Sequence, residues 1–492
     1  MFSRAQVRIS LFLSLFAGLS AHAGPYVPAG DLGLRHDLTV LSDAGIVSGP
    51  MSTWPLAWGP ILSDIERAST TGVEPGVADA LLRVRERAAW ETRSQELVVG
   101  ARLGASDNRP QIRSFQNTPR GRGELSIGVG WLDDAFSVEL NGQLVDAAGD
   151  DDVRLDDSLL GVVIGNWSIG ASTQQRWWGP AWDGSLMLSN NARPIPSVVV
   201  DRVFTDPFEF RWLRWLGPWD FNVMFGELES SRHVPNARFF GMRFNFRPLD
   251  SLEIGLSRTA QWCGDGRPCD ADTFFDLLVG NDNRGDEGIG IDNEPGNQLA
   301  GVDFRWSSRL FDQPIAFYGQ FIGEDEAGGF PSRWIGQFGG EWSGYLRERW
   351  STRLYAEFSG TSCQFYESSE LFNCAYNHGI YETGYRYRGR SIGHPADNDA
   401  RILSFGGVML DADDTRWRFL ARYGKLNRGG VPDSRNTLTS TPQDIASIDV
   451  SHSRTVPFGL IDVGIGYETV DDEQSGSSNN EARFYVQWRS SY

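Results

Sequence analysis

The sequence predicts an all-β transmembrane barrel, antiparallel and of 18 or 20 strands, behind a small N-terminal α-helical bundle. From about Leu97 onward, apolar residues recur at every second position, as in strands with one apolar face. The chain is polar on average, with mean hydropathy −0.33, yet 12% of it is aromatic. Predicted connections alternate between short and long, which is typical of membrane barrels. A soluble all-β protein is the alternative.

The first 23 residues have the pattern of a secretory signal peptide. Arg4 and Arg8 precede an apolar stretch over 9–19, and the small residues of 21–23 suit cleavage after Ala23. The alternative is a membrane-spanning helix, but the apolar run is shorter than the roughly 20 residues that a bilayer requires. We therefore expect export of the chain and removal of 1–23.

Residues 24–96 are predicted to form a periplasmic module of three helices. Apolar residues recur near helical spacing in 32–41, in 60–68 and in 75–90. Asp31 can begin the first helix and Gly45 can end it. A disordered linker is the alternative, and the repeated apolar faces argue against it.

Residues 97–492 are predicted to form the barrel. In 240–247, aromatic and apolar residues alternate with Gly, Arg and Asn, so one face of the strand meets an apolar surrounding and the other a polar lumen. The last strand, 481–492, has Phe484, Val486, Trp488 and Tyr492 on one face and resembles the closing strand of bacterial outer-membrane barrels. The segment 177–207 leaves the strand count open, because it forms either an extra hairpin or a long folded loop.

Charge and cysteine content restrict the partners and the chemistry. The formal net charge of −19 makes nucleic acid a poor partner. Two near-sequence cysteine pairs in an exported chain predict two loop disulfides, Cys263–Cys269 and Cys363–Cys374. Their unequal spacing, without nearby histidines, argues against a zinc site. No metal or cofactor is expected.

Clusters of aromatic and charged residues predict contacts with a sugar polymer. Trp177, Trp178 and Trp182 in 174–185 offer flat rings beside polar groups, although an interfacial girdle or a packed inward loop also uses such residues. Glu324 and Asp325 can accept sugar hydroxyls, and a solvated acidic loop is the alternative. Tyr381 and Arg386 lie in the aromatic and cationic segment 361–399, which suits an anionic polymer.

Catalysis has little support in the sequence, because the few histidines lie outside local catalytic motifs. Triads assemble from distant positions, so this observation weakens an enzyme without excluding it. We expect no enzymatic activity.

Seven segments, in order over most of the mature chain, resemble the Wzi-type capsule assembly proteins of Gram-negative outer membranes. They are 34–56, 174–186, 211–221, 251–268, 294–303, 318–328 and 378–386. The resemblance implies an 18-stranded barrel with a periplasmic helical bundle, and so favours a folded loop in 177–207. It also implies a lectin-like, non-enzymatic role in attaching or organising capsular or exopolysaccharide at the cell surface.

The expected location is therefore the cell outer membrane. The expected partners are the polysaccharide and outer-membrane lipid, without nucleic acid, and the chain is expected as a monomer. The alternative function is a porin-like diffusion channel, which would require an open lumen.

Overall fold

The computed structural model describes residues 25–490, apart from 148, 280–295, 311–312, 328–329, 348 and 431–434. At 276, 279, 325–327 and 330–331 it describes the backbone alone. The expected signal peptide at 1–23, part of the connection 263–296, and Tyr492 lie outside the described residues.

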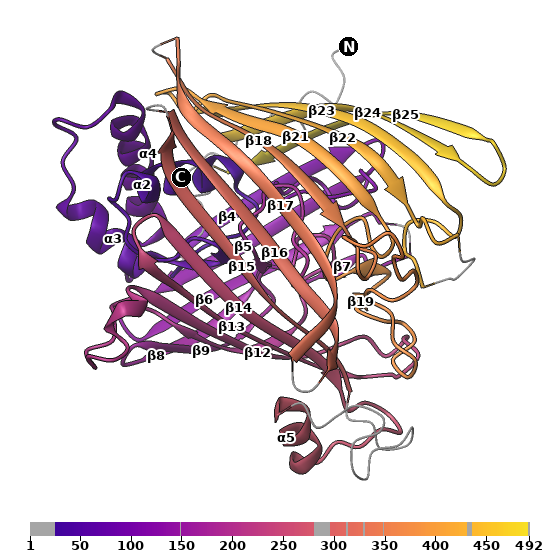
Figure 1. Ribbon diagram of the computed structural model, residues 1–492. Helices are drawn as coiled ribbons and strands as arrows, with labels where there is room; N and C mark the ends of the chain where they lie inside the picture. Colours follow the sequence, from indigo (N-terminus) through magenta and orange to yellow (C-terminus); the bar gives the residue numbers. More distant parts are fainter. Residues whose placement is uncertain are drawn as a thin grey trace, which may run out of the picture.

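The wall of the molecule is a closed antiparallel β-barrel (Figure 1). Its strands are β4 (Val98–Ser106), β5 (Gly123–Leu132), β6 (Phe136–Val145), β7 (Val153–Arg154), β8 (Leu159–Ile164), β9 (Trp167–Ser172), β11 (Ser197–Arg202), β12 (Trp219–Glu227), β13 (Arg238–Leu249), β14 (Leu252–Trp262), β15 (Gly296–Leu310), β16 (Gln313–Ala327), β17 (Phe330–Leu346), β18 (Trp350–Gly360), β21 (Arg401–Leu410), β22 (Arg416–Leu426), β23 (Gln443–Val456), β24 (Gly459–Asp472) and β25 (Ser478–Arg489). The last strand, β25, pairs with the first, β4, which closes the wall.

The described wall has 18 strands, as the sequence and its resemblance predicted. The short β7 and the strand β8 both pair with β6, so they form one interrupted strand. The segment 177–207 contributes β11, which pairs with β9 and β12, while 173–196 forms a connection that folds inward. The expected folded loop is therefore confirmed, and the extra hairpin is not formed. Pro180, Pro194 and Pro196 cannot donate to a strand ladder.

The two faces of the wall differ as the alternation predicted. Outward side chains are apolar and exposed, for example Ile127 and Phe484. Inward side chains are polar, and Arg243 and Asn245 are both fully buried. A closed barrel satisfies its backbone polar groups internally, so an apolar outer surface can meet lipid.

Three helices precede the wall: α2 (Leu32–Asp43), α3 (Trp58–Arg67) and α4 (Pro75–Glu91). The Asp31 side chain accepts a hydrogen bond from the Leu34 N–H at 3.1 Å, which caps α2 as predicted. Gly45 follows α2 with a φ of 71°, a conformation that glycine adopts without strain. The short strands β1 (Tyr26–Val27), β2 (Thr53–Trp54) and β3 (Leu56–Ala57) connect this part of the chain.

Figure 1 shows α2, α3 and α4 at one end of the barrel, which we call the helix end. Asp43 on α2 pairs with Arg305 of the wall at 2.7 Å, and Asp31 pairs with Arg416 and Arg489, each at 2.8 Å. The helices are therefore tied directly to the inner face of the strands.

The opposite end, which we call the loop end, carries the long connections (Figure 1). They contain β10 (Trp177–Trp178), α5 (Ala271–Val279), β19 (Arg386–Tyr387) and β20 (Arg390–Ser391); the short helix η1 (Arg214–Leu216) lies instead between β11 and β12. Both predicted disulfides, Cys263–Cys269 and Cys363–Cys374, are formed in these connections. The described helices include none with the length and apolarity needed to cross a membrane.

Candidate functional site

A single arginine inside the barrel brings together three segments that are distant in sequence. The Arg35 guanidinium, on α2, lies 4.3 Å from the ring centroid of Phe115 and 4.3 Å from that of Trp182. It also donates to the Pro180 carbonyl at 2.8 Å. Phe115 belongs to the connection after β4, and Trp182 belongs to the connection after β9. The helices and two connections of the loop end therefore meet in the interior, where desolvation strengthens cation–π contacts.

The three tryptophans predicted to contact sugar lie in this interior. Trp177, Trp178 and Trp182 are 0%, 0% and 2% exposed. Trp177 and Trp178 form β10, which pairs with β2, and the Trp182 Nε1–H donates to Glu341 at 2.5 Å. Protein covers their ring faces, so this placement does not support direct sugar contact. It corresponds to the packed inward loop that was the alternative.

Carboxylates of the wall hold the backbone of this inward connection. Glu357 on β18 accepts the backbone N–H groups of Trp182 and Asp183 at 2.6 and 3.0 Å. Asp183 in turn pairs with Arg422 of β22 at 2.5 Å. The sequence did not identify Glu357 as a structural anchor. Strand alternation shows that its side chain faces inward, but not whether it contacts water or protein.

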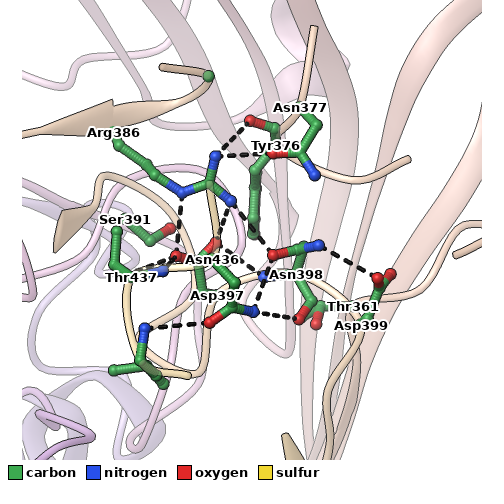
Figure 2. A network of polar contacts seen from close by, with 12 residues as sticks. Thr361, Tyr376, Asn377, Arg386, Ser391, Asp397, Asn398, Asp399, Asn436 and Thr437 are labelled. Carbon is green, nitrogen blue, oxygen red and sulfur yellow. Dashed lines mark hydrogen bonds and ion pairs between the residues drawn. The ribbon is translucent and has the colours of Figure 1, made fainter. Parts of the chain in front are cut away.

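Arg386 is the centre of a polar network in the connection 361–400 (Figure 2). It is 2% exposed, and its guanidinium donates to both oxygens of Asp397, at 3.0 and 2.6 Å. Further acceptors are Asn377 at 2.7 Å and Asn398 at 3.2 Å. Asp397 also accepts the Thr437 hydroxyl at 2.6 Å, which joins the connection after β22 to this network. Arg386 was expected to bind an anionic polymer, but its donors are used within the protein.

Burial shapes the ionisation of this network. Burial opposes the charge on Asp397, yet Arg386 and the hydrogen bonds from Thr437 hold the pKa of Asp397 below its usual range. Burial raises the pKa of Asp399 to about 6. Burial lowers the pKa of His394 to about 4, so this imidazole is neutral at pH 7. The network thus contains the charged pair Arg386–Asp397, and burial opposes charge on the neighbouring Asp399 and His394.

The other predicted sugar-binding residues border the same connection. Tyr381 is 1% exposed, and its hydroxyl donates to the Cys263 carbonyl at 3.1 Å. Glu324 accepts the Tyr376 N–H at 2.8 Å, and Arg386 donates to the Tyr376 carbonyl. The side chain of Asp325 lies outside the described residues. The structure therefore brings Glu324, Tyr381 and Arg386 around one connection, and their contact with sugar stays a prediction.

Within the described ranges, no group of three or more His, Cys, Asp or Glu side chains is placed to hold a metal ion. Two disulfides and the buried Arg386 network fix the loop-end connections. Such an arrangement presents a fixed surface above the barrel.

Comparisons with known proteins identify the family. A family model described as capsule assembly protein Wzi matches residues 101–481. A solved structure of Escherichia coli Wzi, titled as a carbohydrate-binding β-barrel of the outer membrane involved in group 1 capsule assembly, matches with a TM-score of 0.81 and 25% identity, over 94% of this chain and 98% of that chain.

A Klebsiella pneumoniae protein, described as an uncharacterized 55.8 kDa protein in the cps region, is 32% identical over 67% of this chain. The match covers 64% of that relative, which is less than two thirds of its length. The outer-membrane protein OprD of Pseudomonas aeruginosa matches with a TM-score of only 0.43 and 9% identity, over 80% of this chain and 94% of that chain. The family and the closed barrel place the protein in the outer membrane. The chain belongs to the Wzi family of capsule assembly proteins.

Proposed function

We propose that this protein is a non-enzymatic, carbohydrate-binding barrel that holds capsular or exopolysaccharide at the cell surface. The observation that carries the proposal is the match of the Wzi family model to residues 101–481, which span most of the barrel and its connections. The similar fold of the carbohydrate-binding Escherichia coli protein supports it.

The loop end is proposed to face the outside of the cell, and the module of 24–96 the periplasm. Outer-membrane barrels have short periplasmic turns and long extracellular connections, and the wall begins at Val98 and ends at Arg489 on the helix end. Both disulfides then lie outside, where oxidising conditions preserve them.

Outer-membrane lipid and a monomeric state complete the proposal. The exposed apolar side chains of the outer face, such as Leu140, Phe317 and Phe405, suit contact with lipid tails. Pairing of β25 with β4 closes the described wall, so the barrel presents no free edge strand there that would need a second chain.

A diffusion channel is less favoured, because protein groups occupy the interior of the described barrel. Arg243 pairs with Asp303 of the wall at 2.6 Å and donates to Thr53 of the N-terminal module at 2.7 Å. The inward connection after β9 is held in the same lumen by Glu357. A water-filled passage would have to displace these buried contacts.

The test is binding of the surface polysaccharide of the protein's own host to the purified chain in detergent. Binding of the intact polymer, and much weaker binding of the same polymer hydrolysed to short fragments, is expected because many weak contacts add through effective concentration. A refolded porin of the same host is the control barrel. Equal binding to both barrels, or none to this one, would contradict the proposal.

A further inference from the structure

Four arginines at the loop end have no carboxylate partner within the described part of the chain. We call Arg109, Arg113, Arg120 and Arg390 the basic cluster. The first three lie in the connection between β4 and β5, and Arg390 begins β20. Each hydrogen bond that their guanidinium groups donate ends on a backbone carbonyl or an amide oxygen. These acceptors are neutral, so these hydrogen bonds do not neutralise the positive charges of the four guanidinium groups.

Hydrogen bonds to common neighbours show that Arg109, Arg120 and Arg390 lie close together. Arg109 donates to the carbonyl of Arg120 at 3.1 Å. Arg390 donates to the Gln111 carbonyl at 3.2 Å, between Arg109 and Arg113 in sequence. Arg120 and Arg390 both reach Asn191 of the inward connection, at 3.2 and 3.3 Å.

Keeping these like charges together is unfavourable in the protein alone. Arg113 is 3% exposed, and its Nε–H has no hydrogen-bond partner among the described residues. Burial, and then the charges of Arg120 and Arg390, lower the pKa of Arg113 well below its usual range. Burial and the charge of Arg120 lower the pKa of Arg390 to about 10. An anion bound here would relieve both the repulsion and the missing hydrogen bond.

The nearby acids are already engaged. Asp156 accepts Arg193 at 2.9 Å, and Asp150 accepts Arg193 at 2.8 Å. Glu124 lies close to Arg120 but accepts backbone N–H groups, including that of Gly121 at 2.9 Å. Asp157 lies 4.0 Å from Arg102. Burial lowers the pKa of Arg120, and Asp156, Asp157 and Glu124 oppose that shift without forming an ion pair with it. Arg193 is therefore paired with carboxylates, whereas no guanidinium group of the basic cluster takes part in an ion pair among the described residues.

We propose that the basic cluster is a subsite for the carboxylate of an acidic sugar, such as a uronic acid, within the bound polysaccharide. The proposal rests on the proposed function and names the substrate class for it. A guanidinium group presents a planar pair of donors that matches a carboxylate. A chain with net charge −19 would repel an acidic polymer over most of its surface, so attraction has to be local.

The position of the cluster favours a surface polymer over a lipid phosphate. Arg120 and Arg390 bond to the inward connection, and Arg113 is buried above the lumen beside Arg418 and Ser114. The hydrogen bonds of the cluster are to groups of the loop-end connections, not to the outward face of β4, where Leu103 is exposed.

The experiment compares two double variants of the full chain in detergent. R109Q/R390Q removes two charges from the basic cluster, and glutamine can still donate to the same carbonyls. R388Q/R428Q is the matched control, because Arg388 and Arg428 lie at the same end and pair with Asp150 and Glu370, at 3.2 and 2.5 Å. The probes are polygalacturonate and the same polymer with its carboxyl groups reduced to the neutral galactan.

The wild-type protein and the control are expected to bind polygalacturonate more tightly than the neutral polymer, by about tenfold for each arginine–carboxylate contact. R109Q/R390Q is expected to lose that preference. Retention of the preference by R109Q/R390Q, or an equal loss in both variants, overturns the proposal. So does a stronger loss of binding to vesicles containing lipid A, which would assign the cluster to phosphate.

Two further measurements keep the result decisive. In the wild-type protein, polygalacturonate should slow the modification of Arg109 and Arg390 by phenylglyoxal, mapped by mass spectrometry, and the absence of protection overturns the proposal even if the variant does not fold. The host's own polysaccharide is bound in parallel. If R109Q/R390Q binds the host polysaccharide as well as the wild-type protein does, the basic cluster is not its subsite, and the proposed function stands. If the wild-type protein does not bind the host polysaccharide, the proposed function is wrong.

Discussion

Arg386 helps to keep Asp397 ionised out of water, and each of the two side chains makes several further hydrogen bonds. Arg386 reaches Asn377 and Asn398 beside Asp397, and Asp397 also accepts from Thr437. Such a pair adds little to stability compared with an apolar pair, but the loss of one partner leaves a buried charge alone. The connection 361–400 is therefore sensitive to this one residue.

Replacing Arg386 by methionine is expected to destabilise the connection 361–400 by about 3–5 kcal/mol, because Asp397 loses its counter-ion. Limited proteolysis should then cut this connection, while the barrel keeps its heat-modifiable migration in electrophoresis. R388M is the matched control, since Arg388 is partly exposed. An uncut connection in R386M would show that the pair does not hold it.

Asp399 gives the same connection a dependence on pH. Its carboxyl pKa is raised by burial from 3.8 to about 6, so the folded connection binds this proton more tightly. Its contribution to stability is therefore present at low pH and is lost as the pH rises from about 4 to 6. His394, with its pKa lowered by burial to about 4, acts in the opposite direction over this window. The net slope of the wild-type protein does not isolate either group.

The variant D399N isolates the Asp399 contribution. Asparagine can accept the Asn373 N–H that Asp399 accepts at 2.7 Å, and it tolerates the φ of 56° at this position. Hydrogen exchange of 361–400 should be equal in both proteins near pH 4, and slower in D399N above pH 6, by roughly 2 kcal/mol of opening free energy. Identical exchange at both pH values would refute the raised pKa.

At the scale of elements, the wall was predictable and its contents were not. One face of each strand meets lipid and the other a polar interior, so apolar and polar residues alternate along the strand and the sequence predicts it. Arg243, however, has the same pattern whether it faces water or Thr53 of the N-terminal module. The sequence pattern of Trp177 and Trp178 is the same for an exposed sugar-binding surface as for the buried strand β10. The helix α5 was missed because its Phe274 packs against Phe225 and Phe240 of the wall, a long-range contact.

The inward connection is expected to depend on its tryptophans for packing. W177A/W178A should reduce barrel assembly or lower its unfolding temperature, because removing a buried tryptophan side chain costs about 3–5 kcal/mol. W212A/W215A is the matched control, with side chains that are 75% and 63% exposed. Normal assembly and stability of W177A/W178A, with loss of polysaccharide binding, would return these residues to a role in sugar contact.

The disulfides are expected to order connections and not the wall. C363S/C374S should increase proteolysis within 361–400. Without the disulfide, the unfolded connection has more conformational entropy, which favours unfolding of the connection by about 2–4 kcal/mol. The barrel closes through β25 and β4 without either bond, so its heat-modifiable behaviour should persist. Loss of barrel assembly in this variant would contradict that separation.

At the scale of the whole molecule, the module and the inward connection fill one lumen from opposite ends. Asp43 and Asp31 tie the helices to Arg305 and Arg489, and β2 pairs with β10 where the two parts meet. Glu357 holds the inward connection to the opposite part of the wall. Because these contacts are buried, added salt screens them only weakly.

The intact protein is therefore expected to show no steady, porin-sized conductance in a planar bilayer, at low or at high KCl concentration. A porin refolded by the same procedure supplies the positive control for insertion. Steady open steps would mean that the helices or the inward connection leave the lumen in a membrane, and would favour the diffusion channel. Absence of conductance by the inserted barrel, together with polymer binding, would mean that the barrel wall supports a fixed outer surface and does not form an open channel.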